Sequence, residues 1–314
     1  MLKYNKWTLL EIQRGVKNKM GNKHKISNGG EIKTLKPVDF PELLKEIPSL
    51  PKELYLIGEL PAENKIYLAV VGTRKFSNYG KDACEKIISG LKGFNFVIVS
   101  GLALGIDSIA HRAAIENNLL TIAIPGSGLD DKVLHPHSHV KLAEEIVHVG
   151  GCLLSEFPPT MPAGLHTFPQ RNRIIAGISR GTLVIEAPER SGALITAGFA
   201  LEFNRDVFSV PGSIFLENSK GTNKLIKMGA IPVFSAEDIL DAFNIPHEGE
   251  NLKLNLASLP PLEQKILSAL TDPMQTDDLI RKLGLPAHEI NSALTMMTIN
   301  GLIKQSGGEI YRNM

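Results

Sequence analysis

The chain has 314 residues and a formal net charge of +1, and this near-neutral balance does not by itself indicate a nucleic-acid-binding protein. Its length suits one large α/β domain accompanied by one or two small ones. The two isolated cysteines, Cys84 and Cys152, argue against a disulfide framework, and no apolar run approaches the roughly 18 residues that span a bilayer, so we expect a cytoplasmic protein without a membrane segment.

The first two segments of the chain differ in composition from the rest. Residues 1–36 hold nine Lys and Arg residues against two acids, which predicts a basic, flexible leader. Such a leader can bind polyanions, but a solvated tail explains the charge equally well. Residues 37–65 are punctuated by prolines, which break long elements and predict a proline-rich connector.

From residue 66 onward, short apolar runs alternate with helical segments. The runs predict strands at 66–72, 96–101, 119–126, 152–157, 182–187, 206–212 and 231–235. Between them, helices are predicted at 81–91, after Gly105, at 140–147, from Arg171, at 192–203, near 223–227 and from Glu237. This alternation predicts a doubly wound, mostly parallel α/β sheet over residues 66–243.

The C-terminal part of the chain follows another pattern. Residues 244–258 are polar and turn-rich, which predicts a linker. Residues 259–314 contain three amphipathic helical segments, the second with Thr276 as its predicted N-cap, and end in a predicted β-hairpin with Gly307 and Gly308 at its turn. Three helices and a hairpin predict a small winged-helix domain.

Ligands of a doubly wound sheet bind at the carboxyl ends of its strands, and small or polar residues follow several of the predicted strands. The candidates at these ends are Gly72, Thr73, Arg74, Ser100, Gly101, Ser191 and Gly192. An arginine offers phosphate a bidentate donor, and the glycine loops open helices whose free N–H groups can meet an anion. Close backbone packing explains the glycines equally well.

The stretch from Phe168 to Arg173 is the most unusual on this rim. Arg171, Asn172 and Arg173 stand at the predicted start of a helix, where the partial positive charge of the helix end disfavours cations unless an anion lies opposite. A bound phosphate satisfies this requirement, and so does an ion pair with Glu156 or Glu186. Phe168 is a candidate platform for stacking a base, with a core position as the alternative.

Further cations and titratable groups lie near the same rim. Lys220 and Asn223 add a cation and an amide at the predicted start of another helix. The histidines His135, His137 and His139 have the spacing of metal ligands on a strand, but Pro136 breaks that strand, so no metal is expected. Three carboxylates can form an acid/base set or cap helices, namely Asp107, Glu156 and Glu186.

The order of these blocks resembles the DNA-processing protein A (DprA/Smf) family over residues 40–243, and the tail resembles the winged-helix domain of many members. The blocks that carry the resemblance are VGTR, SGLALGIDSIAH, TIAIPGSGLD, LLSEFPP, FPQRNRIIAGIS, VIEAPERSGALITA, VFSVPG and GTNKLIKMGA. The resemblance implies an extended Rossmann-like domain that dimerises, binds single-stranded DNA and loads the recombinase RecA during natural transformation. The family is not known as an enzyme, and the resemblance implies no cofactor. By motif, its DNA contacts fall on Arg74, Arg171, Arg173 and Lys220.

The resemblance also bears on the predicted last helix, Glu237–Phe243. Ile239, Leu240 and Phe243 form an apolar stripe there, which can pack on the sheet. The resemblance instead favours a dimer interface at this place, and the same neighbourhood meets RecA in the family.

The chain departs from the family at three points. Residues 1–36 are too short and polar for the N-terminal helical domain of many members, and His135 and Pro136 stand where Tyr-Pro is usual. The third tail helix has no Lys or Arg between Pro286 and Ile303, so weak or absent duplex binding is expected, since phosphate neutralisation supplies most non-specific affinity.

Two other functions compete with a single-stranded-DNA-binding protein. The first is a nucleotide N-glycosidic hydrolase in which Glu156 or Glu186 acts on ribose, and the second is a nucleotide-sensing module. Related hydrolases carry PGGxGT followed by Glu, whereas the matching loops here read PGSGLD and EAPERSG. The missing motif favours the DNA-binding protein.

Overall fold

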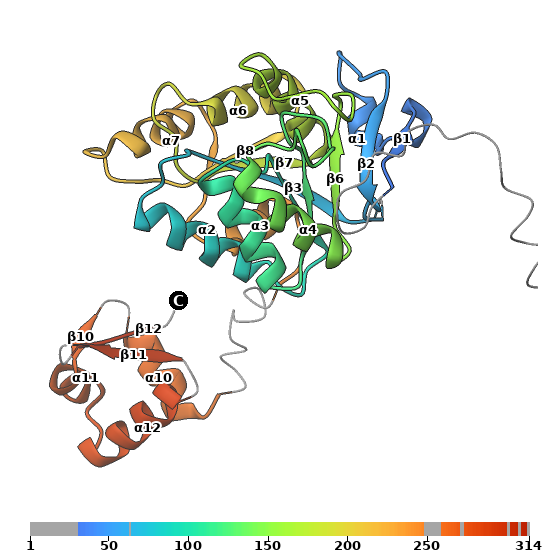
Figure 1. The fold of residues 1–314 in the computed structure, drawn as a ribbon. Coiled ribbons are helices and arrows are strands. Elements are labelled where there is room, and N and C mark those ends of the chain that lie inside the picture. The colour runs from blue at the N-terminus through green and yellow to red at the C-terminus, as the bar shows by residue number, and fades with distance from the viewer. Residues whose placement is uncertain are drawn as a thin grey trace, which may run out of the picture. The chain divides into compact units, whose positions relative to one another are not determined.

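The computed structural model describes residues 31–62, 64–247, 259–270, 273–299, 302–306 and 309–312. It divides into two compact units, a large unit that ends at Ala242 and a small unit that begins at Phe243 (Figure 1). Most of the predicted leader and linker, residues 1–30 and 248–258, lies outside the described residues. Within the described residues, no helix is both long and apolar enough to cross a membrane.

The large unit is built on one sheet with the strand order β1-β2-β6-β5-β4-β3-β7-β8-β9. Seven strands are parallel: β3 (Ile66–Val71), β4 (Phe96–Ser100), β5 (Leu120–Ala123), β6 (Cys152–Ser155), β7 (Gly181–Val184), β8 (Asp206–Ser209) and β9 (Ile231–Pro232). The predicted α/β fold class, a doubly wound and mostly parallel sheet, is confirmed.

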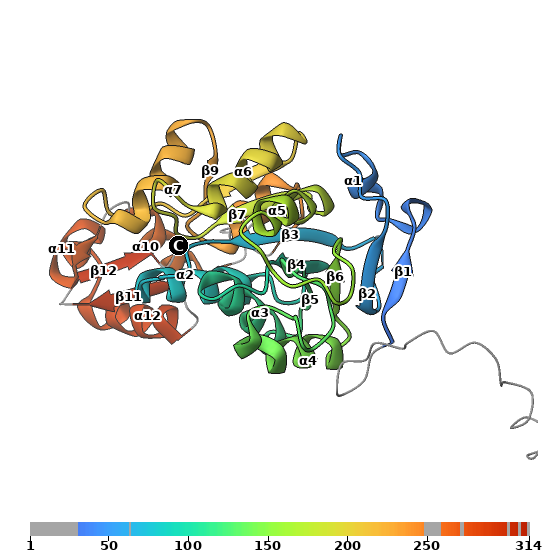
Figure 2. The ribbon, with the colours of Figure 1, turned by 45° about the horizontal axis from the view of Figure 1, so that its top comes forward.

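Helices cover both faces of this sheet (Figure 2). One layer contains α2 (Asn78–Gly90), α3 (Ile106–Glu116), α4 (Val140–His148) and α8 (Ala236–Ala242). The other contains α1 (Glu42–Lys45), α5 (Thr167–Ile178), α6 (Gly192–Glu202) and α7 (Glu217–Lys227). Two short 3-10 helices, η1 (Pro37–Asp39) and η2 (His137–His139), complete the unit.

The central strands read as continuous apolar runs because both of their faces are covered. In β3, Tyr67, Ala69 and Val71 face the layer of α5 and α6, where they belong to the largest cluster of buried side chains. The alternate residues Leu68 and Val70 are equally buried on the opposite face.

The segment predicted as a connector contains one strand, and the end of the predicted flexible leader contains another. β2 (Leu54–Gly58) in the connector pairs antiparallel with β6, and β1 (Lys33–Leu35) in the leader pairs antiparallel with β2, so both segments extend the sheet and the leader is ordered at its end. The sequence pattern does not reveal β2, because its short apolar run stands between Pro51 and Pro61 and its partner β6 lies far along the chain.

The structure corrects the starts of three helices. α5 begins at Thr167, so Arg171 and Arg173 lie in its second turn and the predicted conflict with the helix N-terminus does not arise. α7 begins at Glu217, which places Asn223 inside the helix. Thr276 is the first residue of its helix, and Gln275 is the N-cap.

The apolar stripe assigned to a dimer interface is buried within the chain. Ile239, Leu240 and Phe243 are 0%, 2% and 3% exposed, and α8 packs against α2. The stripe therefore packs on its own chain, which is the alternative that the pattern left open.

The small unit is a winged-helix domain with its own core. Its helices are α10 (Pro261–Ala269), α11 (Thr276–Leu283) and α12 (Ala287–Ile299), and its strands are β10 (Met274–Gln275), β11 (Ile303–Ser306) and β12 (Glu309–Arg312). The strands form a sheet in the order β10-β12-β11, and buried Ile266, Leu279 and Leu294 pack together. The predicted hairpin turn at Gly307 and Gly308 lies outside the described residues.

Candidate functional site

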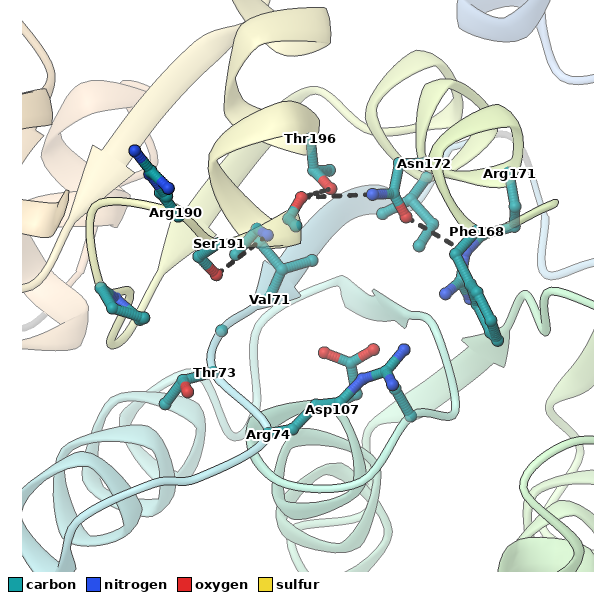
Figure 3. A pocket seen from close by; sticks show the side chains of 16 residues that line it. Val71, Thr73, Arg74, Asp107, Phe168, Arg171, Asn172, Arg190, Ser191 and Thr196 are labelled. Atoms are coloured by element: carbon teal, nitrogen blue, oxygen red, sulfur yellow. Dashed lines mark hydrogen bonds between the residues drawn. The ribbon is translucent and has the colours of Figure 1, made fainter. Parts of the chain in front are cut away.

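A cavity of about 290 Å³ opens at the carboxyl end of β3, the strand at which the sheet order reverses. Successive connections lead from β3 to β4 on one side, while β7 pairs with its other edge, so the loops diverge and leave a crevice. The cavity is lined by Val71, Gly72, Thr73, Arg74, Ala103, Asp107, Phe168, Arg171, Asn172, Ile175, Pro188, Arg190, Ser191, Gly192, Ala193 and Thr196 (Figure 3).

Arg74 presents an exposed guanidinium from a fixed stretch of backbone. The Ile106 N–H donates to the Thr73 carbonyl at 3.2 Å and ties this loop to the start of α3. Gly105 has a φ of +87°, and a Cβ atom there would lie 2.4 Å from the Thr73 carbonyl oxygen, so glycine permits the close approach. The guanidinium carbon of Arg74 lies 5.1 Å from the centroid of the Phe168 ring.

Phe168 is half-buried in the first turn of α5. Its ring packs on Gly126, where an added Cβ would approach within 2.6 Å, and its centroid lies 5.7 Å from that of the His135 ring. The ring therefore has one packed side and remains partly open toward Arg74 and the cavity, which is the geometry of a cation–π pair and of a stacking platform.

Arg171 is a buried cation beneath the cavity, 4% exposed. Its Nη1 donates to the carbonyls of Gly101 and Ile124, and its Nε donates to the Asn172 Oδ1 at 3.2 Å. Burial lowers the pKa of Arg171 to about 10, against the opposing effect of Asp107, so the guanidinium is charged at neutral pH.

Asp107 is the carboxylate among the described lining residues. It accepts the Gly101 N–H at 3.1 Å and also a backbone N–H of Ala103. Burial raises the pKa of Asp107, while Arg171 and these N–H groups act in the opposite direction. The side chains of Asp107 and Arg171 thus hold the loop after β4 in place.

The opposite wall comes from the contact between α5 and α6 (Figure 3). The Asn172 amide donates to the Gly192 carbonyl at 3.2 Å, and the Ser191 Oγ caps α6 by accepting the Ala193 N–H at 3.3 Å. Exposed Arg190 stands just before this cap and also lines the cavity. Arg190 is not among the residues predicted from the sequence, although a cation directly before a Ser-Gly helix start is a usable signal.

Five of the predicted contact residues do not line this cavity, namely Ser100, Gly101, Arg173, Lys220 and Asn223. Arg173 donates to the Ser49 carbonyl at 2.5 Å and pairs with Glu156, the ion-pair alternative left open by the sequence, and its side chain is 11% exposed. Lys220 lies on α7 and pairs with Glu217 at 2.6 Å.

Two more of these five, Asn223 and Ser100, have structural hydrogen bonds. Asn223 donates to the Gly212 carbonyl at 2.9 Å and accepts the N–H of the same residue. Ser100 is fully buried and donates to the Val70 carbonyl at 2.6 Å. Gly101 lines a small adjoining cavity together with Arg74 and Phe168.

The two glutamates considered for ribose chemistry have other partners. Glu186 accepts the N–H and Oγ–H of Ser77, the N-cap residue of α2, at 2.9 and 2.6 Å. Glu156 pairs with Arg173 and accepts from Gln170. Both carboxylates therefore stabilise the fold.

The histidine segment does not form a metal cluster in the described part of the chain, where no group of three His, Cys, Asp or Glu side chains could hold an ion. His139 is buried and its Nδ1 lies 2.7 Å from the Leu102 carbonyl oxygen. His135 and His137 are exposed.

Comparison with known proteins identifies relatives over both units. The family model described as DNA recombination-mediator protein A matches residues 31–244, and the model described as DprA winged helix domain matches residues 252–309. Protein Smf of Escherichia coli (strain K12) is 38% identical over 290 residues, which cover 87% of this chain and 75% of that protein. DNA processing protein DprA of Streptococcus pneumoniae is 45% identical over 205 residues, covering 65% and 71% of the two chains.

Solved structures show the same similarity. The X-ray structure of DNA processing protein A from Streptococcus pneumoniae superposes with a TM-score of 0.63 at 42% identity and covers 67% of this chain and 74% of that one. DNA processing protein A from Helicobacter pylori, whose structure was solved to study its single-stranded-DNA-binding mode, superposes with a TM-score of 0.60 at 27% identity and covers 68% and 95%.

Proposed function

Since the chain belongs to the DNA recombination-mediator protein A family of DNA-processing proteins, we propose that it binds single-stranded DNA in the cavity at the end of β3. One observation carries this proposal: the exposed Arg74 guanidinium lies over the Phe168 ring, beside a cavity with a second, buried guanidinium beneath it. The single-stranded-DNA-binding mode described for the Helicobacter pylori relative supports it.

Each part of the cavity has a role in this proposal. Arg74 and Arg190 are exposed at its mouth and neutralise phosphates of the strand. Phe168 stacks on a base, and since every base has a stacking face, sequence preference is slight. Arg171 makes no direct contact but contributes a fixed positive charge below the ligand.

Replacement of Arg74 tests the proposal. Arg74→Ala should weaken the binding of labelled oligo-dT and reduce the slope of log K against log salt by about 0.7 for each phosphate that is no longer neutralised. Fluorescence anisotropy over a salt series measures both quantities, and a duplex competitor should displace the oligonucleotide poorly. Arg112→Ala is the matched control, because Arg112 is an exposed arginine of α3 that pairs with Glu145. Unchanged affinity and slope in the Arg74 variant would show that the cavity is not the DNA-binding site.

We also propose that the bound strand is protected and passed to the recombinase RecA during natural transformation, and that the chain acts as a homodimer. Family membership supports both statements. Because the stripe on α8 is buried, we place the interface on the exposed side chains beside the edge strand β9, Met228 and Phe234, which are 67% and 68% exposed. Assembly of RecA on oligo-dT coated with a single-strand-binding protein tests loading, and an unchanged assembly rate would contradict it.

A further inference from the structure

The cavity at the end of β3 continues past Phe168 along the rim. A small second cavity shares Arg74 and Phe168 with it and also contacts His135. A third cavity of about 490 Å³ shares His135 and Phe168 with the second and reaches Lys132, His137 and Leu165. Shared lining residues join the three into one groove, which we call the rim groove.

The two walls of the outer part of the rim groove are fixed to each other. The Gly128 N–H donates to the Met161 carbonyl at 2.8 Å, and the Asp130 N–H donates to the Pro159 carbonyl at 2.9 Å. A Cβ atom on Gly128 would lie 2.2 Å from the Pro158 carbonyl oxygen, so these loops approach as closely as glycine allows. The groove is thus part of the folded structure.

The chemistry of the rim groove changes along its length. Arg74 lines the first two cavities, and exposed Lys132 lines the third. Between them lie the rings of Phe168 and His135, tilted by 58° to each other, and the side chain of Leu165, which is 92% exposed. Two cations with rings between them match a DNA strand whose phosphates lie outside and whose bases stack inside.

From this arrangement we propose that the rim groove takes further nucleotides of the same DNA strand, with His135 stacking on a base and Lys132 contacting a phosphate. This proposal rests on the single-stranded-DNA binding proposed above. It extends the site from the cavity at β3 to the loop between β5 and α4 and makes binding depend on the length of the oligonucleotide.

Substitution of His135 tests the stacking contact. His135→Ala should weaken binding of a 20-residue oligo-dT at least ~5-fold, which corresponds to the lower end of the range for removal of a base stack, whereas His135→Phe should keep it because the ring is retained. For the shortest oligo-dT that the parent chain still binds, the affinity of the His135→Ala variant should equal that of the parent chain. His148→Ala is the control, since His148 is exposed on α4 away from the groove.

Substitution of Lys132 tests the phosphate contact. Lys132→Ala should lower the salt slope for the 20-residue oligo-dT by about 0.7, and Lys141→Ala, an exposed lysine of α4, should leave it unchanged. If Arg74→Ala weakens binding while His135→Ala and Lys132→Ala match their controls, DNA does not bind along the rim groove, and only the proposed binding in the cavity at β3 is supported. If the full chain binds no oligo-dT, the proposed function fails and the rim groove fails with it.

Discussion

Phe168 is half-buried, packs on Gly126 and lies under the Arg74 guanidinium, so measurements can separate a role in the core from a role in DNA binding. Phe168→Ala should lose roughly 1–3 kcal/mol of affinity for single-stranded DNA, because the stack with a base is removed. The melting temperature should fall only slightly, since the ring is half-buried. Anisotropy and thermal unfolding of the same sample measure both.

A second phenylalanine provides the comparison for Phe168. Phe203 stacks on Phe199 at 5.7 Å, and neither residue lines the cavity at β3. Phe203→Ala should therefore lower the melting temperature and leave DNA affinity unchanged. If Phe168→Ala behaves in the same way, Phe168 is a core residue only.

His111 is a fully buried imidazole on α3 that should make the fold sensitive to acid. The Thr121 hydroxyl donates to the Ile98 carbonyl, so it accepts from the His111 Nδ1–H at 2.7 Å. The pKa of His111 is lowered to about 3, mainly by burial and to a smaller extent by the charges of His139 and Arg171. In the unfolded chain the ordinary value is about 6.5. Because only the unfolded chain takes up the proton between these values, stability is complete above pH 6.5 and is lost as pH falls toward 3.

The decrease at pH 5 should amount to about 2 kcal/mol of unfolding free energy, from about 1.36 kcal/mol per pH unit. His111→Asn should show a smaller difference between pH 7 and pH 5, because the amide can donate to Thr121 and does not titrate in this range. Urea unfolding followed by circular dichroism measures the difference. His148→Asn, at an exposed position, should retain the acid sensitivity of the parent chain. Equal acid sensitivity in all three proteins would contradict the assignment to His111.

At the scale of elements, the junction of β2 with β6 depends on a glycine. Gly58 has a φ of +90°, and an added Cβ would lie 2.5 Å from the Gly151 carbonyl oxygen. Gly58→Ala should therefore combine backbone strain with a steric overlap. Gly93 has a φ of +87° but nothing within 4 Å of the added Cβ, so Gly93→Ala isolates the strain, about 1–2 kcal/mol.

The difference between the two glycine variants should be about 1–3 kcal/mol, the usual cost of overpacking. Unfolding free energies from urea titration provide the comparison. Equal decreases in the two variants would show that the strands at Gly58 shift without cost.

Comparison of β2 with the parallel strands shows which elements of the fold can be predicted from sequence patterns and which cannot. The parallel strands and most of their helices are predictable because each is a local run with its own periodicity. β2 escapes prediction because its pairing partner is distant in sequence, and nothing within residues 54–58 specifies it. The start of α5 is not predicted either. Pro169, the third residue of the helix, suggests that the helix begins after it, although proline is tolerated in a first turn.

The candidate site is predictable to a smaller extent. The position of the rim follows from the fold class alone, and Arg74, Phe168, Asn172 and Ser191 do line one cavity. The direction of a side chain is set by its tertiary neighbours, however. Arg171 and Arg173 are separated by one residue, yet Arg171 points to the loops after β4 and β5 and Arg173 points to Glu156.

At the scale of the whole molecule, the proposed homodimer gives a measurable mass. Light scattering of the full chain at tens of micromolar should report a dimer, and Phe234→Arg should report a folded monomer, because a charge replaces an exposed apolar side chain at the interface. Val149→Arg changes an apolar residue that is 41% exposed after α4 and should leave the dimer intact. A monomeric parent chain, or a dimeric Phe234→Arg variant, would refute this placement.

The cavity at β3 has walls from both helical layers of the large unit. Arg74 and Asp107 belong to the layer of α2 and α3, whereas Phe168, Asn172 and Ser191 belong to that of α5 and α6 (Figure 3). A bound DNA strand that contacts both layers therefore acts as a removable cross-link between them. At a concentration one hundred times its dissociation constant, it would add about 2.7 kcal/mol to the free energy of unfolding. Amide hydrogen exchange should then slow in α2 and α3 as well as in α5 and α6. DNA bound in one crevice would thus stabilise the helices on both faces of the sheet.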